Sequence, residues 1–135
     1  MNPPCILVVE DNPITRKLFR VALAGEGYTV LEAPDGRTAL ELMGRHAPQM
    51  VLQDLILPDM DGLELTRALK HDPATRDIRV VALTAYAMKG DEQKALGAGC
   101  DGYIAKPINT RTLGGVVAGY LERPPRVRVL MGLAM

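Results

Sequence analysis

Five short runs of apolar residues, separated by segments with helical periodicity, constrain the fold of this chain more than any other feature. The first run, CILVV, is continuous and rich in β-branched residues, which is typical of a strand covered on both faces. Strands that alternate with helices predict βαβ units, right-handed crossovers and a parallel sheet. The expected strands cover residues 5–9, 28–33, 50–53, 78–83 and 103–105.

The segments between these runs carry helix start signals. Asn12 can cap a first helix, with Pro13 in the first turn, where its missing N–H costs nothing. Asp35 and Asn109 are candidate caps of the second and last helices. The apolar stripe expected for the first helix consists of Ile14, Leu18, Val21 and Ala22.

These units predict an α/β fold, namely a flavodoxin-like (βα)5 three-layer sandwich around a parallel five-stranded sheet. The strand order 2-1-3-4-5 is favoured because it places Asp11 and Asp54 on either side of the point where the order reverses. We expect residues 1–122 to form this domain and residues 123–135 to be a C-terminal tail. The tail's alternating RVRV can form an edge strand or a partner-binding peptide, but a disordered terminus or a cut linker is favoured.

The composition excludes several classes of function. Sixteen basic and sixteen acidic residues balance in this chain of 135, so no basic surface argues for nucleic acid. No apolar run approaches the roughly 18 residues that cross a bilayer, and the N-terminus leaves no room for a signal peptide. We therefore expect no membrane insertion and a cytoplasmic location. Cys5 and Cys100 lack metal-ligand spacing and are expected to be reduced.

Polar residues follow the ends of four of the predicted strands. Glu10 and Asp11 follow the first strand, Asp54 the third, Thr84 the fourth and Lys106 the fifth. The carboxyl ends of parallel strands meet at one edge of the sheet, where ligands bind such folds. Carboxylates, a hydroxyl and an ammonium group on one edge suit a divalent cation and a phosphoryl group.

Three carboxylates in one pocket repel one another unless a hard cation is bound. Mg²⁺, or Mn²⁺ in its place, suits direct ligation by Asp11 and Asp54, with Glu10 binding directly or through water. Asp54 would then attack phosphorus in line, while Lys106 and Thr84 contact the phosphoryl oxygens. The expected product is an acyl phosphate on Asp54.

Each of these residues taken alone has a simpler interpretation. Asp11 can be a helix cap, Thr84 a strand residue, and Lys106 a solvated amine. Asp59 and Asp61 are expected to form turns rather than bind metal. The combination of the required groups at four strand ends favours phosphoryl transfer.

The stretches VVEDNP, QDLILPDMDGLEL and ALTAYAMKGDEQKALGAGCDGYIAKPI resemble the receiver domain of two-component response regulators. The resemblance extends over residues 5–122. The last of these stretches is most similar to stand-alone receivers that control cell-cycle kinases and to receivers attached to hybrid histidine kinases.

The resemblance implies roles for individual residues. Asp54 matches the aspartate that takes a phosphoryl group from a phosphohistidine on a histidine kinase or a histidine phosphotransferase. Glu10 and Asp11 match the acidic pair that binds Mg²⁺. The backbone carbonyl of Ile56 matches a further metal ligand.

The resemblance also implies a switch. Thr84 matches the signalling hydroxyl and Tyr103 the aromatic residue that turns inward, and Lys106–Pro107 is expected to be a cis peptide. The face formed by the fourth helix, fifth strand and fifth helix would change shape and meet a downstream protein. The implied function is a phosphorylation-dependent switch of a phosphorelay. It is not a turnover enzyme, because transfer consumes the carboxylate.

One position departs from the family pattern, and two others are positions that set the rate of dephosphorylation in the family. Gln53 stands where the family often has an apolar residue. Ile56 and Tyr86 occupy positions that tune dephosphorylation, and their bulky side chains predict a slowly hydrolysing acyl phosphate. Two alternatives are a degenerate receiver that only docks proteins and a flavin-binding protein of similar topology. The second requires a Ser/Thr/Gly-rich phosphate loop where this chain has EDNP.

Overall fold

Five parallel strands form one sheet in the order β2-β1-β3-β4-β5, which confirms the predicted topology. The computed structural model describes residues 3–84 and 90–123. In chain order the elements are β1 (Cys5–Val9), α1 (Pro13–Gly25), β2 (Thr29–Ala33), α2 (Gly36–His46), β3 (Met50–Asp54), α3 (Gly62–His71), β4 (Arg79–Thr84), α4 (Asp91–Ala98), β5 (Gly102–Ala105) and α5 (Leu113–Glu122).

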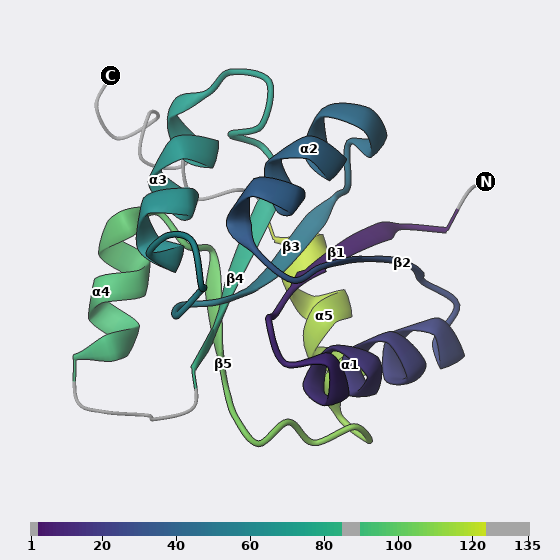
Figure 1. Ribbon diagram of the computed structural model, residues 1–135. Coiled ribbons are helices and arrows are strands. Elements are labelled where there is room, and N and C mark those ends of the chain that lie inside the picture. Colours follow the sequence, from purple (N-terminus) through teal and green to yellow (C-terminus); the bar gives the residue numbers. More distant parts are fainter. Residues whose placement is uncertain (1–2, 85–89, 124–135) are drawn as a thin grey trace.

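The helices cover the sheet on both sides, as the continuous apolar strands predicted. Figure 1 shows α1 and α5 on one face of the sheet and α2, α3 and α4 on the other. Leu7 and Val9 of β1 belong to the core beneath α2–α4, whereas Ile6 and Val8 belong to the core beneath α1 and α5. Successive strand residues point to opposite faces, so each buried strand needs apolar residues throughout.

Side-chain caps start the first two helices. The Asn12 side-chain oxygen accepts hydrogen bonds from the amides of Ile14 at 2.9 Å and Thr15 at 3.2 Å. The Asp35 side chain accepts one from the amide of Thr38 at 2.7 Å. These contacts satisfy amides that the first helical turn leaves without a partner, and they confirm both predicted caps.

The last helix begins later than predicted. Its N-cap is Thr112, and Asn109 instead begins the preceding turn, where its side chain accepts a hydrogen bond from the amide of Arg111. The main-chain carbonyl of Asn109 accepts from Thr112 and Leu113. Asn109 therefore caps a turn rather than α5. The two cases look alike in sequence because both use a short polar side chain on nearby amides.

The predicted apolar face of α1 was wrong at three of its four positions, whereas Ala22 packs against the core as predicted. Phe19 and Leu23 are fully buried, whereas Ile14, Leu18 and Val21 are 72%, 48% and 60% exposed. Two faces of α1 carry apolar residues, and the face that packs on the sheet is the one with the large aromatic ring of Phe19. Burying such a ring or a leucine side chain stabilises the fold by about 1.5–3 kcal/mol. Ile14 and Leu18 are left at the surface near the carboxyl ends of the strands.

The boundaries of four strands differ from the prediction by one residue. β3 ends at Asp54 rather than residue 53, and β5 begins at Gly102 rather than residue 103. β2 begins at Thr29 rather than residue 28, and β4 runs from Arg79 to Thr84 rather than over 78–83. Thr84 is therefore the last residue of its strand. In the parallel ladder with β5, Thr84 pairs with Ala105.

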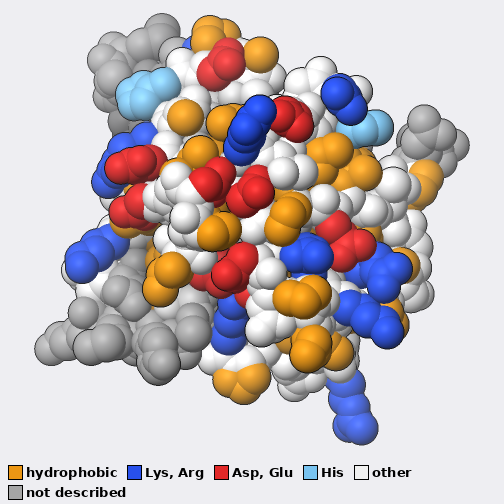
Figure 2. Space-filling view, viewed as in Figure 1, with side chains coloured by type: hydrophobic (Ala, Val, Ile, Leu, Met, Phe, Trp, Pro, Cys, Tyr) orange, Lys and Arg blue, Asp and Glu red, His pale blue; other side chains and the backbone are white. Residues whose placement is uncertain are grey.

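Charged residues are mixed on the surface. Figure 2 shows acidic and basic side chains interspersed with hydrophobic ones over the face in view. This distribution agrees with the equal numbers of acidic and basic residues. Among the residues that the structure describes, no helix combines the length and apolar character that a membrane span requires.

Candidate functional site

Three carboxylates meet where β1 and β3 end. Glu10 and Asp11 follow β1 and Asp54 ends β3, and one oxygen of each lies within 4.8 Å of the others. The two strands are neighbours in the sheet, so their carboxyl ends are adjacent. Glu10 is only 2% exposed, whereas Asp11 faces solvent. The arrangement therefore has one buried side and one open side.

Lys106 brings a positive charge to this cluster from beyond β5. Its Nζ atom lies 2.8 Å from Oε2 of Glu10 and 2.8 Å from Oδ2 of Asp54. Its amide donates a hydrogen bond to the carbonyl of Thr84 at 2.7 Å, and the Lys106–Pro107 peptide bond is cis. The ammonium group therefore bridges two carboxylates from two different strands.

The site perturbs the acidity of its members. Burial raises the pKa of Glu10 from 4.5 to about 7; Asp54 adds to the rise, and Lys106 opposes it. Burial also acts to raise the pKa of Asp54, but its contacts with Glu10, the amide of Ile56 and Lys106 lower that pKa overall. Burial acts to lower the pKa of Lys106, and its two carboxylate partners raise it overall. Asp54 is thus held ionised, as a nucleophile must be.

The loop after β3 is tied closely to Asp54. The amide of Ile56 donates a hydrogen bond to Oδ1 of Asp54 at 3.0 Å, while the Ile56 side chain is 76% exposed. The amide of Gly62 donates to the carbonyl of Leu55 at 2.9 Å and closes the loop. A Cβ atom at Gly62 would lie 2.5 Å from the carbonyl oxygen of Asp54, so only glycine fits there.

Asp59 and Asp61 in this loop bind backbone amides. Asp61 caps α3 by accepting a hydrogen bond from the amide of Leu63. The two carboxylate oxygens of Asp59 accept from the amides of Gly36 and Arg37, each at 2.9 Å, at the start of α2. Both residues therefore shape the backbone rather than join the acidic cluster. The partner of Asp59 lies 23 residues away, so no local pattern indicates this contact.

Sequence reasoning missed Arg16, which holds the main chain of the acidic pair. Its Nη1 atom donates a hydrogen bond to the carbonyl of Glu10 at 2.8 Å and a longer one to that of Asp11 at 3.4 Å. Its Nε atom pairs with Glu32 of β2 at 3.4 Å. Arg16 thus connects the loop between β1 and α1 to the neighbouring strand.

The remaining candidate residues lie farther along the same edge. Thr84 is 6% exposed at the end of β4, next to the strand that precedes Lys106. Tyr103 is partly buried against the core beneath α2–α4. The hydroxyl of Tyr120 lies 3.4 Å from both the amide and the carbonyl of Tyr103, which links β5 to α5. Tyr86 lies outside the described residues.

The donor set at the site fits a hard divalent cation. Its ligand atoms are carboxylate oxygens, which Mg²⁺ and Mn²⁺ prefer, and the open side at Asp11 leaves room for water. The raised pKa of Glu10 reports the cost of crowding negative charge in a buried place. A divalent cation would remove that cost.

Comparison with known proteins agrees with this arrangement. Residues 6–118 match the response regulator receiver domain family. The chain is 44% identical over 107 residues to the polar-differentiation response regulator DivK of Brucella anthropi, covering 79% of this chain and 87% of that protein. It is also 44% identical over 104 residues to DivK of Brucella ovis, covering 77% and 85%.

Solved structures show the same fold. A response regulator from Chloroflexus aurantiacus superposes with a TM-score of 0.85 at 29% identity, covering 90% of this chain and 99% of that one. The receiver domain of a sensor histidine kinase from Pseudomonas aeruginosa, described with a magnesium ion in its active-site cleft, gives a TM-score of 0.81 at 32% identity, with coverage of 90% and 99%. The chain therefore belongs to the response regulator receiver domains, the phosphorylation-dependent switches of two-component signalling.

Proposed function

We propose that this protein accepts a phosphoryl group on Asp54 from a phosphohistidine of a histidine kinase or a histidine phosphotransferase. The observation that carries the proposal is the convergence of Lys106, Glu10 and Asp11 around Asp54. A docking module without phosphotransfer would not need this combination of groups. The family match also sets aside the flavin-binding alternative.

The transfer is an in-line displacement. An ionised oxygen of Asp54 forms a bond to phosphorus, the P–N bond of the phosphohistidine breaks, and its electron pair stays on the imidazole nitrogen. Asp11, Asp54 and the main chain of Ile56 would hold Mg²⁺, with Glu10 binding directly or through water. Bound Mg²⁺ neutralises charge on the phosphoryl oxygens.

Lys106 and Thr84 are proposed to bind the transferred group. Lys106 already contacts Oδ2 of Asp54 at 2.8 Å, so a short movement places its ammonium group on a phosphoryl oxygen. Thr84, at the end of the next strand, would donate a hydrogen bond to another phosphoryl oxygen. These contacts exist only in the phosphorylated state and therefore favour one conformation over the other.

The proposed output surface is formed by α4, β5 and α5. Its supporting observation is the contact of Tyr103 in β5 with the Tyr120 hydroxyl of α5. That contact is with the main chain of Tyr103 and joins β5 to α5, whereas the Tyr103 ring packs on the other face of the sheet. A rotation of this ring as Thr84 moves would change the surface on the α4 side of β5. A stabilisation difference of roughly 2–5 kcal/mol is enough to redistribute the two states. A downstream protein would bind the shifted surface.

The phosphodonor is proposed to approach over the apolar rim of the site. A cavity of about 370 Å³ beside Lys106 is lined by Thr15, Leu18, Pro107 and Ile108. Ile14 and Ile56 are also exposed near this edge. Apolar groups around a charged centre can exclude water from the contact with a donor protein.

We further propose the bounds of the domain, its chemistry and its cellular compartment. Residues 1–122 would form the receiver domain and 123–135 a tail, and the only chemistry would be self-catalysed phosphorylation and dephosphorylation of Asp54. Cys5 and Cys100 are both in the reduced form, which supports a reducing compartment such as the cytoplasm. Ile56 offers no carboxylate or amide to orient water, so hydrolysis of the acyl phosphate would be slow.

Labelling of the purified protein tests the proposal. The wild-type protein should gain one phosphoryl group from acetyl phosphate or a histidine kinase in the presence of Mg²⁺, and lose the label on alkaline treatment. Asp54→Asn should abolish labelling, while Asp59→Asn, in the same loop, should retain it. Equal labelling of Asp54→Asn and wild-type protein would refute the assignment. Loss of the wild-type label within seconds would refute slow hydrolysis.

A further inference from the structure

Gln53 is a fully buried polar residue immediately before Asp54 in β3. Its Nε2 atom donates hydrogen bonds to the carbonyl of Gly62 at 2.5 Å and to Oγ1 of Thr66 at 2.6 Å. Its Oε1 atom has no hydrogen-bond partner among the described residues. Gln53 is thus only partly satisfied in a buried layer.

Such a residue lowers stability relative to an apolar residue of similar size. A buried amide oxygen without a partner loses its hydrogen bonds to water and gains none in return. The core on this face of the sheet also contains apolar residues, including Val51 and Leu65. Methionine would fill the same space without a polar atom. The glutamine must therefore be explained by the contacts it makes, not by packing.

Those contacts join the two ends of the β3–α3 loop, residues 55–61. Gln53 precedes the loop, and Gly62 is the first residue of α3 that follows it. Gly62 also donates its amide to Leu55, and its Cα lies against the carbonyl of Asp54. Moving the start of α3 would therefore move the loop relative to Asp54.

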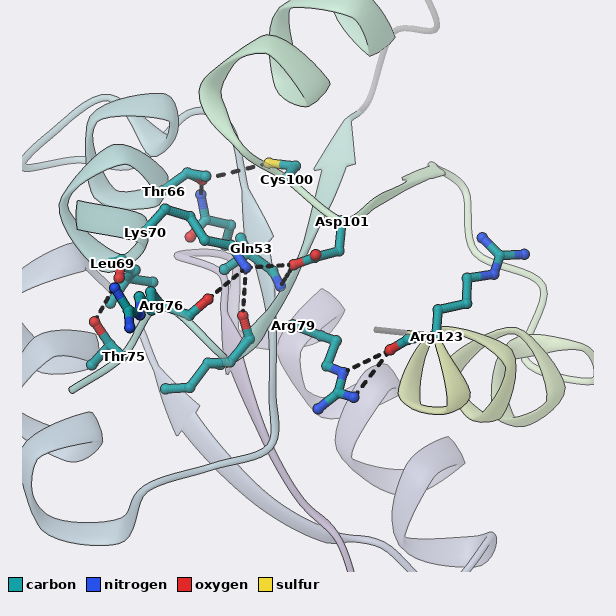
Figure 3. A network of polar contacts seen from close by, with 12 residues as sticks. Gln53, Thr66, Leu69, Lys70, Thr75, Arg76, Arg79, Cys100, Asp101 and Arg123 are labelled. Atoms are coloured by element: carbon teal, nitrogen blue, oxygen red, sulfur yellow. Dashed lines mark hydrogen bonds and ion pairs between the residues drawn. The ribbon is translucent and has the colours of Figure 1, made fainter. Parts of the chain in front are cut away.

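The second acceptor fixes the first turn of α3. Oγ1 of Thr66 lies 3.1 Å from the carbonyl of Gly62 and 3.5 Å from Sγ of Cys100, which precedes β5. Figure 3 shows Gln53, Thr66 and Cys100 in this order between β3, α3 and the end of α4. The hydrogen bond from Gln53 thus holds the first turn of α3 against β3. Cys100, which precedes β5, contacts the same Thr66 hydroxyl.

We propose that Gln53 is a positioning residue for the metal site: its two hydrogen bonds hold the start of α3, and with it the β3–α3 loop and the Ile56 main chain, in place beside Asp54. This inference rests on the proposed function, because it assigns a use to the loop in binding Mg²⁺. It explains why a partly unsatisfied glutamine is present next to the proposed phosphoacceptor. It also predicts that stability and metal affinity respond in opposite directions to its removal.

Three variants of the full chain test this role. Gln53→Met removes both hydrogen bonds and keeps the volume, and Thr66→Val removes one of them. Cys100→Ala is the matched control, because it disturbs the same buried cluster without touching the loop. The Mg²⁺ dissociation constant is measured by calorimetry, the melting temperature by circular dichroism, and hydrogen exchange of the Gly62 amide by NMR without metal.

Gln53→Met should bind Mg²⁺ about threefold to tenfold more weakly, a loss as large as the net value of a single hydrogen bond, because the two lost bonds act on the metal only through the loop. Its melting temperature should equal or exceed that of the wild type, and the Gly62 amide should exchange faster. Thr66→Val should weaken binding less. Cys100→Ala should melt earlier and bind Mg²⁺ normally, because a purely structural disturbance affects stability alone.

Wild-type Mg²⁺ affinity and Gly62 exchange in Gln53→Met would overturn the inference. If that variant does not fold, Thr66→Val decides in the same way. A wild-type protein that fails to bind Mg²⁺ would contradict the proposed function instead. The Gly62 exchange rates, measured without metal, would in that case still support or overturn the role of Gln53 in holding the loop.

Discussion

At the scale of single residues, the site is governed by the balance between one positive charge and several carboxylates. One ammonium group, that of Lys106, contacts two carboxylates at 2.8 Å. It cannot balance the whole acidic cluster, and the pKa of Glu10 rises to about 7 while that of Asp54 falls. At a pH near 7, Glu10 therefore holds a proton, whereas Asp54 stays ionised.

Binding of Mg²⁺ should consequently depend on pH. A cation displaces the proton of Glu10, so the dissociation constant should be about tenfold weaker at pH 6 than at pH 8, as linkage requires for a pKa near 7. Calorimetric titration at the two pH values measures this. Glu10→Gln should bind with little pH dependence in this range, and an unchanged wild-type affinity would contradict the prediction.

Without metal, the same shift makes stability fall as pH rises. The folded protein holds a proton on Glu10 that the unfolded chain releases at lower pH, because the pKa is raised from 4.5 to about 7 on folding. The contribution of Glu10 is therefore present below pH 4.5 and is lost as the pH rises through 7. Urea unfolding in EDTA, compared between wild type and Glu10→Gln, isolates this contribution.

Two arginines on α1 offer a matched pair of variants. Arg16 and Arg20 both pair with Glu32, at 3.4 Å and 3.3 Å, but only Arg16 also donates to the carbonyls of Glu10 and Asp11. Arg16→Met should weaken Mg²⁺ binding about threefold to tenfold, the value of one hydrogen bond. Arg20→Met removes the same charge and should leave affinity nearly unchanged. Equal effects in calorimetry would show that Arg16 acts only through charge.

At the scale of elements, a buried ion pair joins α3 to the start of β4 and β5. Lys70 and Asp101 are each 5% exposed and lie 2.8 Å apart. Lys70 also donates to the carbonyls of Arg76 and Ile78 in the segment before β4 (Figure 3). Asp101 accepts from the amide of Val80. These contacts satisfy both charges with several partners.

Removing one member of this pair should be costly. Lys70→Met leaves the Asp101 carboxylate buried without its cation, and should lower the free energy of unfolding by about 3–5 kcal/mol. Urea denaturation measures the change. The double variant Lys70→Met/Asp101→Asn should recover part of the loss, because no charge then remains buried. A loss below about 1 kcal/mol in the single variant would mean that the pair behaves as a surface ion pair.

At the scale of the whole molecule, the site connects segments that are far apart in sequence. Lys106 pairs with Glu10 across 96 positions and with Asp54 across 52. A cation bound there is available only to the folded state, because the unfolded chain does not bring these groups together. Metal binding and global stability are therefore linked.

Mg²⁺ should accordingly stabilise the fold as a whole. At roughly 100 times its dissociation constant it should add about 2.7 kcal/mol to the free energy of unfolding. Thermal melting with Mg²⁺ and with EDTA measures the difference. Asp11→Asn, which removes an exposed carboxylate that is proposed to bind the metal, should melt like wild type in EDTA but gain less from Mg²⁺. An equal gain in this variant would exclude Asp11 from the metal site.

The residue pattern of the chain determined the architecture. Apolar runs that fill both faces of a strand, alternating with capped helices, restrict the chain to a parallel sheet covered on two sides. The order β2-β1-β3-β4-β5, which the structure has, was predicted from the convergence of Asp11 and Asp54 rather than from this pattern. The polar residues at the strand ends were also identifiable, because parallel strands place their carboxyl ends on one edge.

Only the tertiary structure decided which of several compatible contacts form. The face of α1 that packs on the sheet is the one with Phe19, not the expected stripe, because packing depends on the shape of the opposing layer. The support of the acidic pair by Arg16 and of the β3–α3 loop by Gln53 depends on atoms brought within hydrogen-bond distance by folding. Periodicity specifies which side of an element is buried or exposed, but a hydrogen bond requires the position of its partner, and that position exists only after distant segments have packed.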